Sequence, residues 1–483
     1  MMPETNVAFR SGDDRLMRVW NAAEEKCRRN LRDFGGDTVL VEGGGYDKIW
    51  LETQPMGGEM YALRNLEAAR NNSLLFMRFQ RADGRLPGSI RCVNGKPEPQ
   101  FDKYQGFCFP FHALNLYYLL GKDRLWLDRL EDTLVRFDEC LWKTRHLTGD
   151  GLLSSFCVYD TGEDNALRYG DAPCRWEKDT PPEGFRIVPM ASMDVTSWSF
   201  SARRTLAEIC RIRGGAGADD WMDKARSVAR SLRKGLWDRK RGALFDRDCR
   251  GNKVDVLCHN TLRCMYWGSV SKAMADRFVR EHLLNPSEFW TPFPLPSVSV
   301  SDPAFRNAPG NNWSGQSEGL TWQRAILALE RYGYSRIVTR LGEKLIGAVD
   351  RCGLRFTQQF DPFTGEASLV DAATGLPVPD GDSAPVQDSY GPTALSCLGY
   401  IAHRYGIHPH LGQVWFSLGS GKPYEYDAVF AGHVCSVHSD GSRAEIRMDG
   451  KILGRWKCGR RVIASEDGRI LRTELIEYRE TSI

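Results

Sequence analysis

Apolar residues recur three to four positions apart over most of the chain up to about residue 405, which is the spacing that places them on one face of an α-helix. Loops rich in Gly, Pro, Asp and Asn separate these segments, and strands do not alternate with them. The pattern therefore predicts a mainly α body instead of a parallel sheet. The clearest helical segments are Arg15–Asp33, Gly58–Ala82, Ala113–Leu120, Arg124–Trp142, Ser192–Arg213, Trp221–Leu236, Lys272–Leu284, Gly319–Tyr332, Ser335–Val349 and Pro392–Tyr405.

Several loops between these helices are long and carry aromatic and polar side chains. The longest are Val41–Gly57, Thr148–Ala191, Asn285–Ser317 and Phe356–Tyr390. Connections in compact domains usually take about 4–6 residues, so loops of this length are commonly functional. Paired helices closed into a ring, with such loops on one face, make an (α/α)6 toroid. We assign this toroid to residues 1–408.

The last seventy residues have a different pattern. Short alternating runs are separated by the pairs Asp440-Gly441, Asp449-Gly450 and Asp467-Gly468, and Asp-Gly between alternating runs is typical of β-hairpins. We therefore expect a small antiparallel β domain over residues 409–483. Its expected strands are His433–His438, Arg443–Met448, Lys451–Lys457, Arg461–Ala464 and Ile470–Glu477.

Composition narrows the function classes. The 65 Lys and Arg residues nearly balance the 62 Asp and Glu residues, and no long basic block is present, so we expect no nucleic-acid partner. Apolar runs are too short to cross a membrane, and the first ten residues lack the apolar core of a secretory signal, which favours a cytoplasmic protein.

No motif for metal binding is present. The 14 cysteines form no Cys-x-x-Cys pair and the nine histidines form no His-x-x-x-His pair, so we expect neither metal nor cofactor. The sequence leaves open whether the chain forms a homo-oligomer.

Candidate chemistry lies in four loops. One places Asp160, Glu163 and Asp164 within five positions, and neighbouring carboxylates raise one another's pKa, as general-acid catalysis requires. An acidic helix cap or a calcium loop would have the same spacing. The segments 50–56, 311–318 and 356–366 join aromatic rings to polar side chains, a combination that suits sugars, although each could separately be a turn or cap. Together the four loops favour a carbohydrate as the small-molecule partner.

The segment from Asp160 to Asn165 resembles the acidic loop of glycoside hydrolase families 37 (trehalases) and 63 (processing α-glucosidase I and mannosylglycerate hydrolase). Further resemblances follow in the family order, and together they run from about residue 45 to 405. They are Met193-Asp-Val-Thr-Ser-Trp, Leu236-Trp-Asp, Phe245-Asp-Arg-Asp248, Leu295-Pro-Ser-Val, Asp302-Pro-Ala-Phe, Asn312-Trp-Ser-Gly-Gln316 and Phe360-Asp-Pro-Phe-Thr-Gly365.

The resemblance implies the (α/α)6 fold and hydrolysis of α-glycosides with inversion, most simply by an exo-acting enzyme on gluco-configured di- or oligosaccharides. It makes Asp164 the general acid, and it gives Trp50 and Trp313 the place of sugar-facing walls. The remaining expected substrate-binding residues are Glu52, Gln54, Arg168, Asp194, Gln316, Gln359 and Tyr390.

One position departs from the family. The general base is expected four residues before the proline of the Phe360–Gly365 motif, and this chain has Gln358 there, which cannot accept a proton from water at neutral pH. Another carboxylate could act as the base, with Glu366 our first choice and Glu318 our second. The glutamine could instead be a deliberate replacement of Glu, or the chemistry could be that of a lyase, an epimerase or a phosphorylase. A sugar-binding protein that has lost catalysis is a further hypothesis.

Overall fold

The computed structural model describes residues 2–310, 313–371 and 387–478, and its body is a ring of helices. Six helices of the described chain are almost entirely buried and line the inside of the ring: α2 (Gln54–Met60), α4 (Pro110–Leu119), α6 (Met193–Ile212), α8 (Asn260–Trp267), α10 (Gly319–Glu330) and α12 (Gly391–Tyr405). Six others alternate with them along the chain and cover the outside: α1 (Asp14–Arg29), α3 (Leu66–Arg78), α5 (Arg124–Arg145), α7 (Ala218–Leu236), α9 (Lys272–Phe278) and α11 (Ser335–Arg351).

The inner helices close on themselves. Each contacts the next inner helix in the chain, and α12 contacts α2, so the ring has no open edge among the described residues. The outer helices bury one apolar stripe and expose their polar face. This amphipathic pattern is the periodicity from which the helices were predicted in the sequence. The mainly helical (α/α)6 fold expected from the sequence is therefore present.

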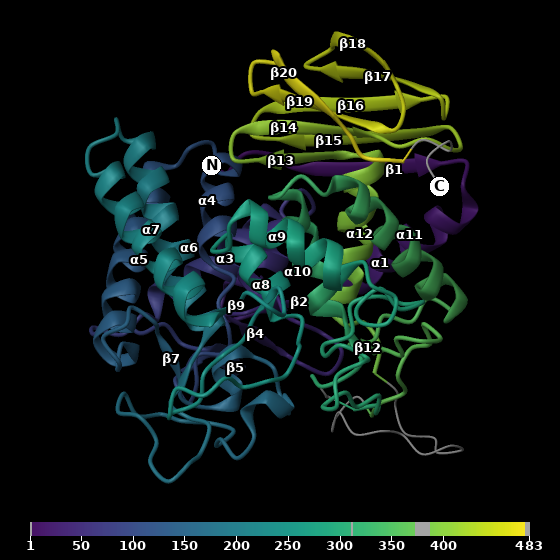
Figure 1. The fold of residues 1–483 in the computed structure, drawn as a ribbon. Coiled ribbons are helices and arrows are strands. Elements are labelled where there is room, and N and C mark those ends of the chain that lie inside the picture. Colours follow the sequence, from purple (N-terminus) through teal and green to yellow (C-terminus); the bar gives the residue numbers. More distant parts are fainter. Residues whose placement is uncertain (1, 311–312, 372–386, 479–483) are drawn as a thin grey trace.

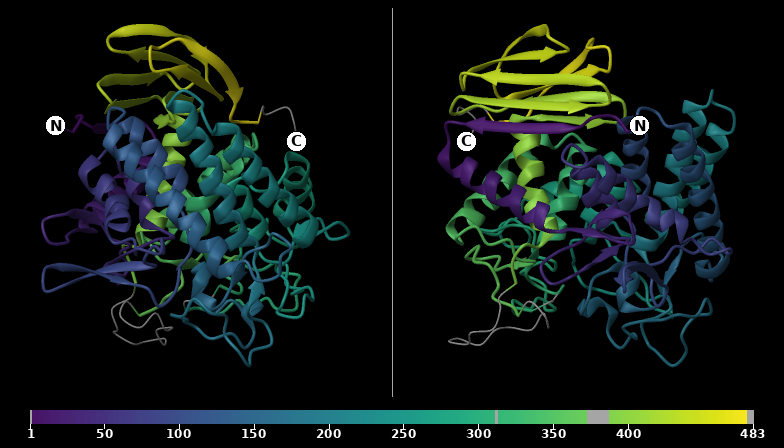
Figure 2. Two further views of the ribbon diagram at one scale, coloured as in Figure 1. Left: turned by 90° about the vertical axis from the view of Figure 1, so that its left-hand side faces the viewer. Right: turned by 180° about the vertical axis from the view of Figure 1, so that it is seen from behind.

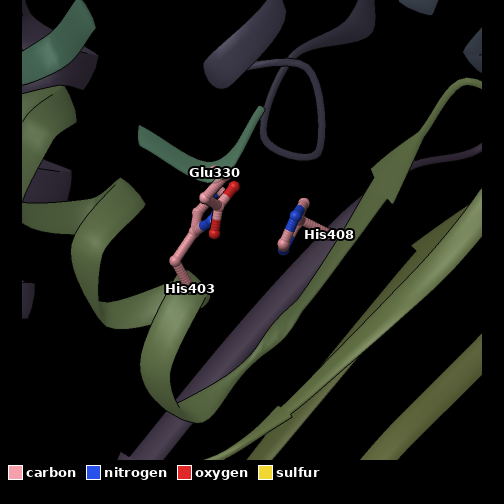
Figure 3. A group of neighbouring side chains, drawn as sticks. All are labelled: Glu330, His403 and His408. Carbon is pink, nitrogen blue, oxygen red and sulfur yellow. The ribbon is translucent and has the colours of Figure 1, made fainter. Parts of the chain in front are cut away.

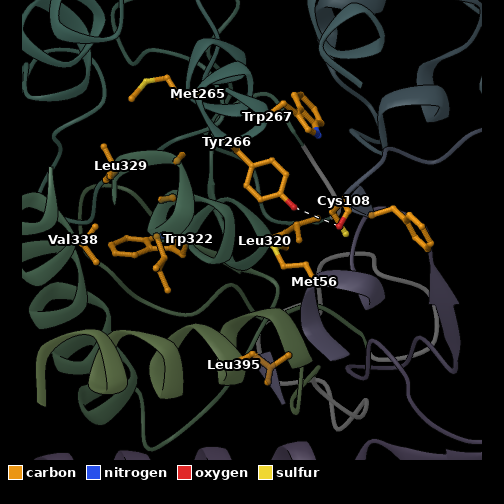
Figure 4. Packing of buried hydrophobic residues seen from close by; sticks show 14 of the residues in the cluster. Met56, Cys108, Met265, Tyr266, Trp267, Leu320, Trp322, Leu329, Val338 and Leu395 are labelled. Atoms are coloured by element: carbon orange, nitrogen blue, oxygen red, sulfur yellow. Dashed lines mark hydrogen bonds between the residues drawn. The ribbon is translucent and has the colours of Figure 1, made fainter. Parts of the chain in front are cut away.

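The wall of the ring is packed with large apolar side chains. Figure 4 shows Trp267 and Tyr266 of α8 beside Leu320 and Trp322 of α10, with Leu395 of α12 opposite. The hydroxyl of Tyr266 also reaches the main-chain oxygen of Cys108, just before α4, at 3.5 Å. Three successive inner helices are thus joined by side chains that are at most 3% exposed.

Three helical predictions needed correction. The segment 58–82 is two helices, because Asn65 caps α3 by accepting a 2.8 Å hydrogen bond from the backbone N–H of Ala68. The segment 272–284 is α9 followed by a π-helical turn over Val279–Leu283. Helix α8 was not among the predicted segments, because all eight of its residues are buried and it has no polar face to create a period.

Two antiparallel sheets pack face to face on one end of the ring (Figures 1 and 2). The first contains β1 (Asn6–Ser11), β15 (Tyr424–Phe430), β16 (His433–Ser439), β17 (Arg443–Met448) and β18 (Lys451–Lys457). The second contains β13 (Ile407–His410), β14 (Gln413–Leu418), β19 (Arg460–Ser465) and β20 (Ile470–Leu475). The expected C-terminal β region is present, and β1 adds the N-terminal residues to it by pairing with β15.

Short strands lie within the loops at the other end of the ring, where Figure 1 shows β4, β5, β7 and β12. Among the described residues, no helix has both the length and the apolar character needed to cross a membrane. The short strands are β2 (Leu31–Asp33), β3 (Thr38–Leu40), β4 (Lys48–Trp50), β5 (Ser89–Val93), β6 (Lys96–Gln100), β7 (Ser154–Ser155), β8 (Met190–Ala191), β9 (Trp237–Asp238), β10 (Ala243–Leu244), β11 (Ser317–Glu318) and β12 (Gln359–Phe360).

Candidate active site

The N-terminal ends of the inner helices carry most of the polar residues singled out in the sequence. Asp194 lies in the first turn of α6, Glu318 immediately precedes α10, and Tyr390 immediately precedes α12. Glu52 lies two residues before α2. Because each N-terminus carries a partial positive charge, this end of the ring favours negatively charged groups.

Four carboxylates, which we call the acidic cluster, influence one another here: Glu42, Glu52, Asp164 and Glu318. Glu52 is 5% exposed, and it accepts hydrogen bonds from Arg324 at 3.0 Å and from Gln105 at 3.2 Å. Burial raises the pKa of Glu52 to about 7 against the opposing charge of Arg324, and the charge of Asp164 adds to the increase. Glu52 therefore holds a proton up to neutral pH, far above the range of an exposed glutamate.

Asp164 follows the 3-10 turn Val158–Thr161 and is partly exposed. A β-carbon built on Gly162, whose φ is 73°, would lie 2.0 Å from a carboxylate oxygen of Glu52, so only glycine lets the Asp164 loop approach so closely. The charge of Asp164 also raises the pKa of Glu42 and Glu318. The structure thus brings the predicted general acid to the acidic cluster.

Glu318 is fully buried. Gln359 donates a 2.6 Å hydrogen bond to its Oε1, whereas its Oε2 has no hydrogen-bond partner among the described residues. Burial raises the pKa of Glu318 well above the ordinary value, and the charges of Asp164 and Glu52 add to this effect. A buried carboxylate oxygen without a partner is costly, which suggests that it serves a ligand or a water molecule.

Glu42 was not identified from the sequence. It accepts a 2.9 Å hydrogen bond from the hydroxyl of Tyr390, and burial raises its pKa well above the ordinary value. The signal in the sequence was the glycine run that follows it. A β-carbon on Gly43, where φ is 76°, would lie 2.1 Å from the side chain of Asn30, so this loop is held tightly against its neighbours.

Replacement of Glu42 by Gln is expected to stabilise the protein increasingly as pH rises. The folded protein retains the Glu42 proton at pH values where the unfolded chain has lost it, so above the ordinary pKa of 4.5 the wild type loses stability. The difference in unfolding free energy should grow in favour of Glu42→Gln by about 1.4 kcal/mol per pH unit until the folded-state pKa is reached. Urea denaturation of both proteins at pH 5, 6 and 7 measures it, and a difference that stays constant with pH contradicts the assignment.

A network of ion pairs lies beneath the acidic cluster, and it includes two residues that we predicted to bind sugar hydroxyls. Arg168 contacts Asp194 at 3.1 Å and also pairs with Glu163 and Asp246. Arg263 contacts Glu163 at 3.0 Å and Asp194 at 2.9 Å. The charges of Arg168 and Asp194 are thus paired within the protein, and their expected contact with substrate stays a prediction.

Glu163, the middle carboxylate of the sequence motif, belongs to this network and not to the acidic cluster. His259 and Asn260, at the start of α8, both hydrogen-bond to it at 2.9 Å. Although burial opposes it, the charges of Arg168 and Arg263 hold the pKa of Glu163 well below the ordinary range. Glu163 is therefore a charged, structural carboxylate, whose role is to fix the loop that carries Asp164.

The structure does not bring Glu366 into the acidic cluster. Its side chain is exposed, and its main chain closes a turn in which the backbone N–H of Asp361 donates a 2.9 Å hydrogen bond to the carbonyl of Glu366. Gln358 is 7% exposed and accepts a 3.1 Å hydrogen bond from the hydroxyl of Tyr46. Our first choice of base thus lies on the surface, which corrects that prediction. The glutamine at the family's base position is bonded to Tyr46, on which the charges of Glu42, Asp164 and Glu318 act.

The remaining predicted residues divide between the site and its support. Gln54 accepts a 2.7 Å hydrogen bond from the backbone N–H of Trp50 and thereby holds the turn before α2. Gln316 donates to Asn307 at 3.2 Å. The Trp50 ring is partly exposed, with the ammonium of Lys48 5.0 Å from its centroid, and its indole N–H has no partner among the described residues.

Trp313 lies beside the Asp164 loop. Its backbone N–H donates to the carbonyl of Asp164 at 3.3 Å, and its ring meets that of His259 edge-on at a centroid distance of 5.9 Å. Trp313 is 3% exposed. The first two residues of its motif, Asn311 and Asn312, lie outside the described residues.

A group of metal-ligand type, Glu330, His403 and His408, lies at the opposite end of the ring, under the sheets (Figure 3). It does not fit a metal ion. Arg461 already forms an ion pair with Glu330, placing a positive charge where a cation would bind. The two imidazole rings stack 3.8 Å apart at 26°, so their in-plane lone pairs do not converge on one point. We interpret the group as an ion pair that joins α10 and α12 to β19.

Comparison with known proteins gives one family match. The profile of the mannosylglycerate hydrolase MGH1-like glycoside hydrolase domain matches residues 56–376. No curated protein sequence matches the chain.

Solved structures share the fold at low sequence identity. The GH63 mannosylglycerate hydrolase from Thermus thermophilus, in complex with glucose, has a TM-score of 0.61 at 18% identity, covering 80% of this chain and 100% of that one. Neutral trehalase Nth1 from Saccharomyces cerevisiae has a TM-score of 0.53 at 12% identity, covering 79% and 80%. A sialidase has a TM-score of 0.69 at 14% identity, covering 95% of this chain but 41% of its own.

Proposed function

We propose that this chain, which belongs to the mannosylglycerate hydrolase MGH1-like glycoside hydrolase family, hydrolyses α-glycosidic bonds of gluco-configured di- or oligosaccharides with inversion. The observation that carries the proposal is the acidic cluster at the N-terminal ends of the inner helices. Inverting glycosidases need one carboxyl group to protonate the leaving oxygen and another to activate water on the opposite face of the sugar.

Asp164 is the proposed general acid. As a residue it is partly exposed, whereas Glu42, Glu52 and Glu318 are buried, so it is the most accessible residue of these four. Burial raises the pKa of the neighbouring Glu52 to about 7, and the charge of Asp164 adds to that increase, so protonated carboxyl groups occur in this cluster near neutral pH. Asp164 would donate its proton to the glycosidic oxygen as the bond to the anomeric carbon breaks.

Glu318 is the proposed general base, in place of the missing glutamate at position 358. Strands β11 and β12 pair so that Glu318 lies opposite Gln359, and the backbone N–H of Gly319 donates to the carbonyl of Gln358 at 2.7 Å. A carboxylate on β11 can therefore serve the region that β12 serves in the family. In its deprotonated form Glu318 would accept the proton from water at Oε2, which has no hydrogen-bond partner among the described residues. Because its pKa is raised well above the ordinary value, the deprotonated form becomes more abundant as pH rises, so this step should become faster with increasing pH. In inverting enzymes the two carboxyl groups lie about 6.5–9.5 Å apart.

The substrate class rests on the family and on the chemistry of the site. The Thermus structure is that of a mannosylglycerate hydrolase in complex with glucose, and the yeast structure is that of a trehalase. Both enzyme names refer to hydrolysis of a small glycoside. Trp50 offers a partly exposed ring face, and Gln358 an amide, for such a sugar.

The proposal is tested by incubating the purified chain with trehalose, maltose, kojibiose, nigerose and mannosylglycerate, and following products by proton NMR. We expect the sugar whose anomeric carbon is attacked to be released as the β-anomer, because attack by water inverts the α-linkage. For trehalose the leaving glucose keeps its α-configuration, so equal amounts of α- and β-glucose should appear first, and only α-glucose at the start would reject the inverting mechanism. Absence of monosaccharide from every compound, including longer α-glucans, would reject hydrolysis of this substrate class.

A second candidate is a non-hydrolytic sugar enzyme on the same toroid, which Gln358 favours because a lyase, an epimerase or a phosphorylase needs no carboxylate base for water. The same NMR experiment separates the two. An unsaturated sugar, an epimerised sugar or, in the presence of phosphate, a sugar phosphate would support this candidate. Free monosaccharide without any of these products supports hydrolysis.

A further inference from the structure

A cavity lies where the helical ring meets the sheets, and its wall contains no residue of the acidic cluster. Its volume is about 430 Å³, and its wall includes Arg204 of α6, Arg331 after α10 and Arg472 of β20. Arg204 lies in the C-terminal half of α6 and Arg331 just after α10, whereas Asp194 lies in the first turn of α6 and Glu318 immediately precedes α10. The cavity is thus not part of the proposed active site.

Its charge is positive once the ion pairs are assigned. The two glutamates of the wall are both occupied, since Glu208 pairs with Arg211 at 3.0 Å and Glu330 pairs with Arg461 and His403. In the described part of the chain, no salt bridge reaches Arg204, Arg331 or Arg472. Three guanidinium groups that form no salt bridge in that part of the chain therefore line one cavity, although the charge of Glu208 acts on Arg204.

Two of these arginines are close to each other. A β-carbon on Gly268, after α8, would lie 2.6 Å from Nη1 of Arg331 and 2.8 Å from Nη1 of Arg204, so both guanidinium groups crowd the same glycine. Burial lowers the pKa of Arg331 to about 9, and the neighbouring charge of Arg204 adds to the decrease. Like charges held this close repel one another, and an anion placed between them relieves the repulsion.

We propose that this cavity binds a small phosphorylated ligand, with a phosphate dianion held between Arg204 and Arg331 and approached by Arg472. The planar guanidinium group presents paired N–H donors that match the oxygens of phosphate. Arg331 uses one nitrogen to bond the carbonyl of Trp267 at 2.9 Å, which fixes its position and leaves its other donors for an anion. The volume exceeds that of phosphate alone, so a phosphate ester of a small alcohol or sugar fits.

The test is isothermal titration calorimetry at low ionic strength with inorganic phosphate and with glucose 6-phosphate. Wild type is expected to bind both, and Arg204→Gln should weaken both at least tenfold, as should Arg472→Gln, which lies on a different element. Arg226→Gln is the matched control, because Arg226 is an exposed arginine of α7 that already pairs with Asp223. It should bind like wild type.

Two controls make the result decisive. Excess glucose must not displace inorganic phosphate, because the cavity is separate from the acidic cluster, and thermal unfolding must show that both Gln variants are folded. Wild type that binds neither probe would overturn the proposal, as would folded variants that bind like wild type. Binding of glucose 6-phosphate that glucose abolishes would assign the ligand to the active site instead.

Discussion

Replacement of Asp164 by Asn is expected to lower kcat on an α-linked disaccharide by about 10³-fold, the usual contribution of a general acid. The amide has nearly the shape of the carboxyl group but cannot release a proton to the leaving oxygen. The loss should shrink markedly with an α-glucosyl fluoride or a 4-nitrophenyl glycoside, because these leaving groups need little protonation. Initial rates on the two kinds of substrate measure the effect.

The dependence on the leaving group separates catalysis from structure. Asp171→Asn is a suitable control, because Asp171 lies on the same long loop and pairs with the exposed Arg186 at 3.0 Å. This variant should keep wild-type rates on both substrates. If Asp164→Asn loses the same factor in kcat on the disaccharide and on the fluoride or nitrophenyl substrate, Asp164 is not the general acid. A general distortion of the site would lower both rates equally, because it does not depend on the leaving group.

Replacement of Glu318 by Gln is the second large effect that we expect, with a fall in kcat of about 10³-fold on every substrate, activated or not. Water still has to be deprotonated whatever the leaving group, so fluoride does not rescue this variant. Azide, a nucleophile that needs no base, should restore turnover and yield a β-glycosyl azide from an α-glycosyl fluoride. Product analysis by NMR with and without azide tests this expectation.

Two further variants assign the base among the nearby groups. Gln358→Glu restores the glutamate of the family but should change activity little, because Glu318 already serves this position. Glu42→Gln removes another buried glutamate of the acidic cluster and should keep most of the activity. A large gain from Gln358→Glu, or a loss from Glu42→Gln that azide rescues, would contradict Glu318 as the base.

The fold could be predicted well where local patterns determine structure. The strands Arg443–Met448 and Lys451–Lys457 have the expected bounds, because an Asp-Gly turn between alternating runs determines the hairpin. The shift in register between Ile446 and Arg447 could not be predicted from the turn. Strand β1 could not be predicted in the same way, since its pairing with β15 depends on a segment more than four hundred positions away. Helix α8 was missed for a different reason, as a fully buried helix has no amphipathic period.

The loops that form the candidate site could be predicted from the sequence, but the role of each carboxylate could not. The sequence placed Asp160, Glu163 and Asp164 together, yet only the fold separates their environments. Asp160 contacts Arg145 at 2.8 Å, Glu163 pairs with Arg168 and Arg263, and only Asp164 of the three belongs to the acidic cluster. The partners that decide this, Arg145 and Arg263, come from other helices, and no spacing in the loop reveals them.

Pairing of β1 with β15 has a consequence for how the polypeptide reaches its native state. During synthesis the first strand leaves the ribosome long before its hydrogen-bonding partner exists, so Asn6–Ser11 must wait until Tyr424–Phe430 has been translated. Contacts between such distant segments form slowly, because closing a large loop costs entropy before the new contacts compensate for it. The seam that joins these two distant segments is thus among the last parts of the molecule to assemble, and N-terminal truncations will expose the edge of β15 to other chains.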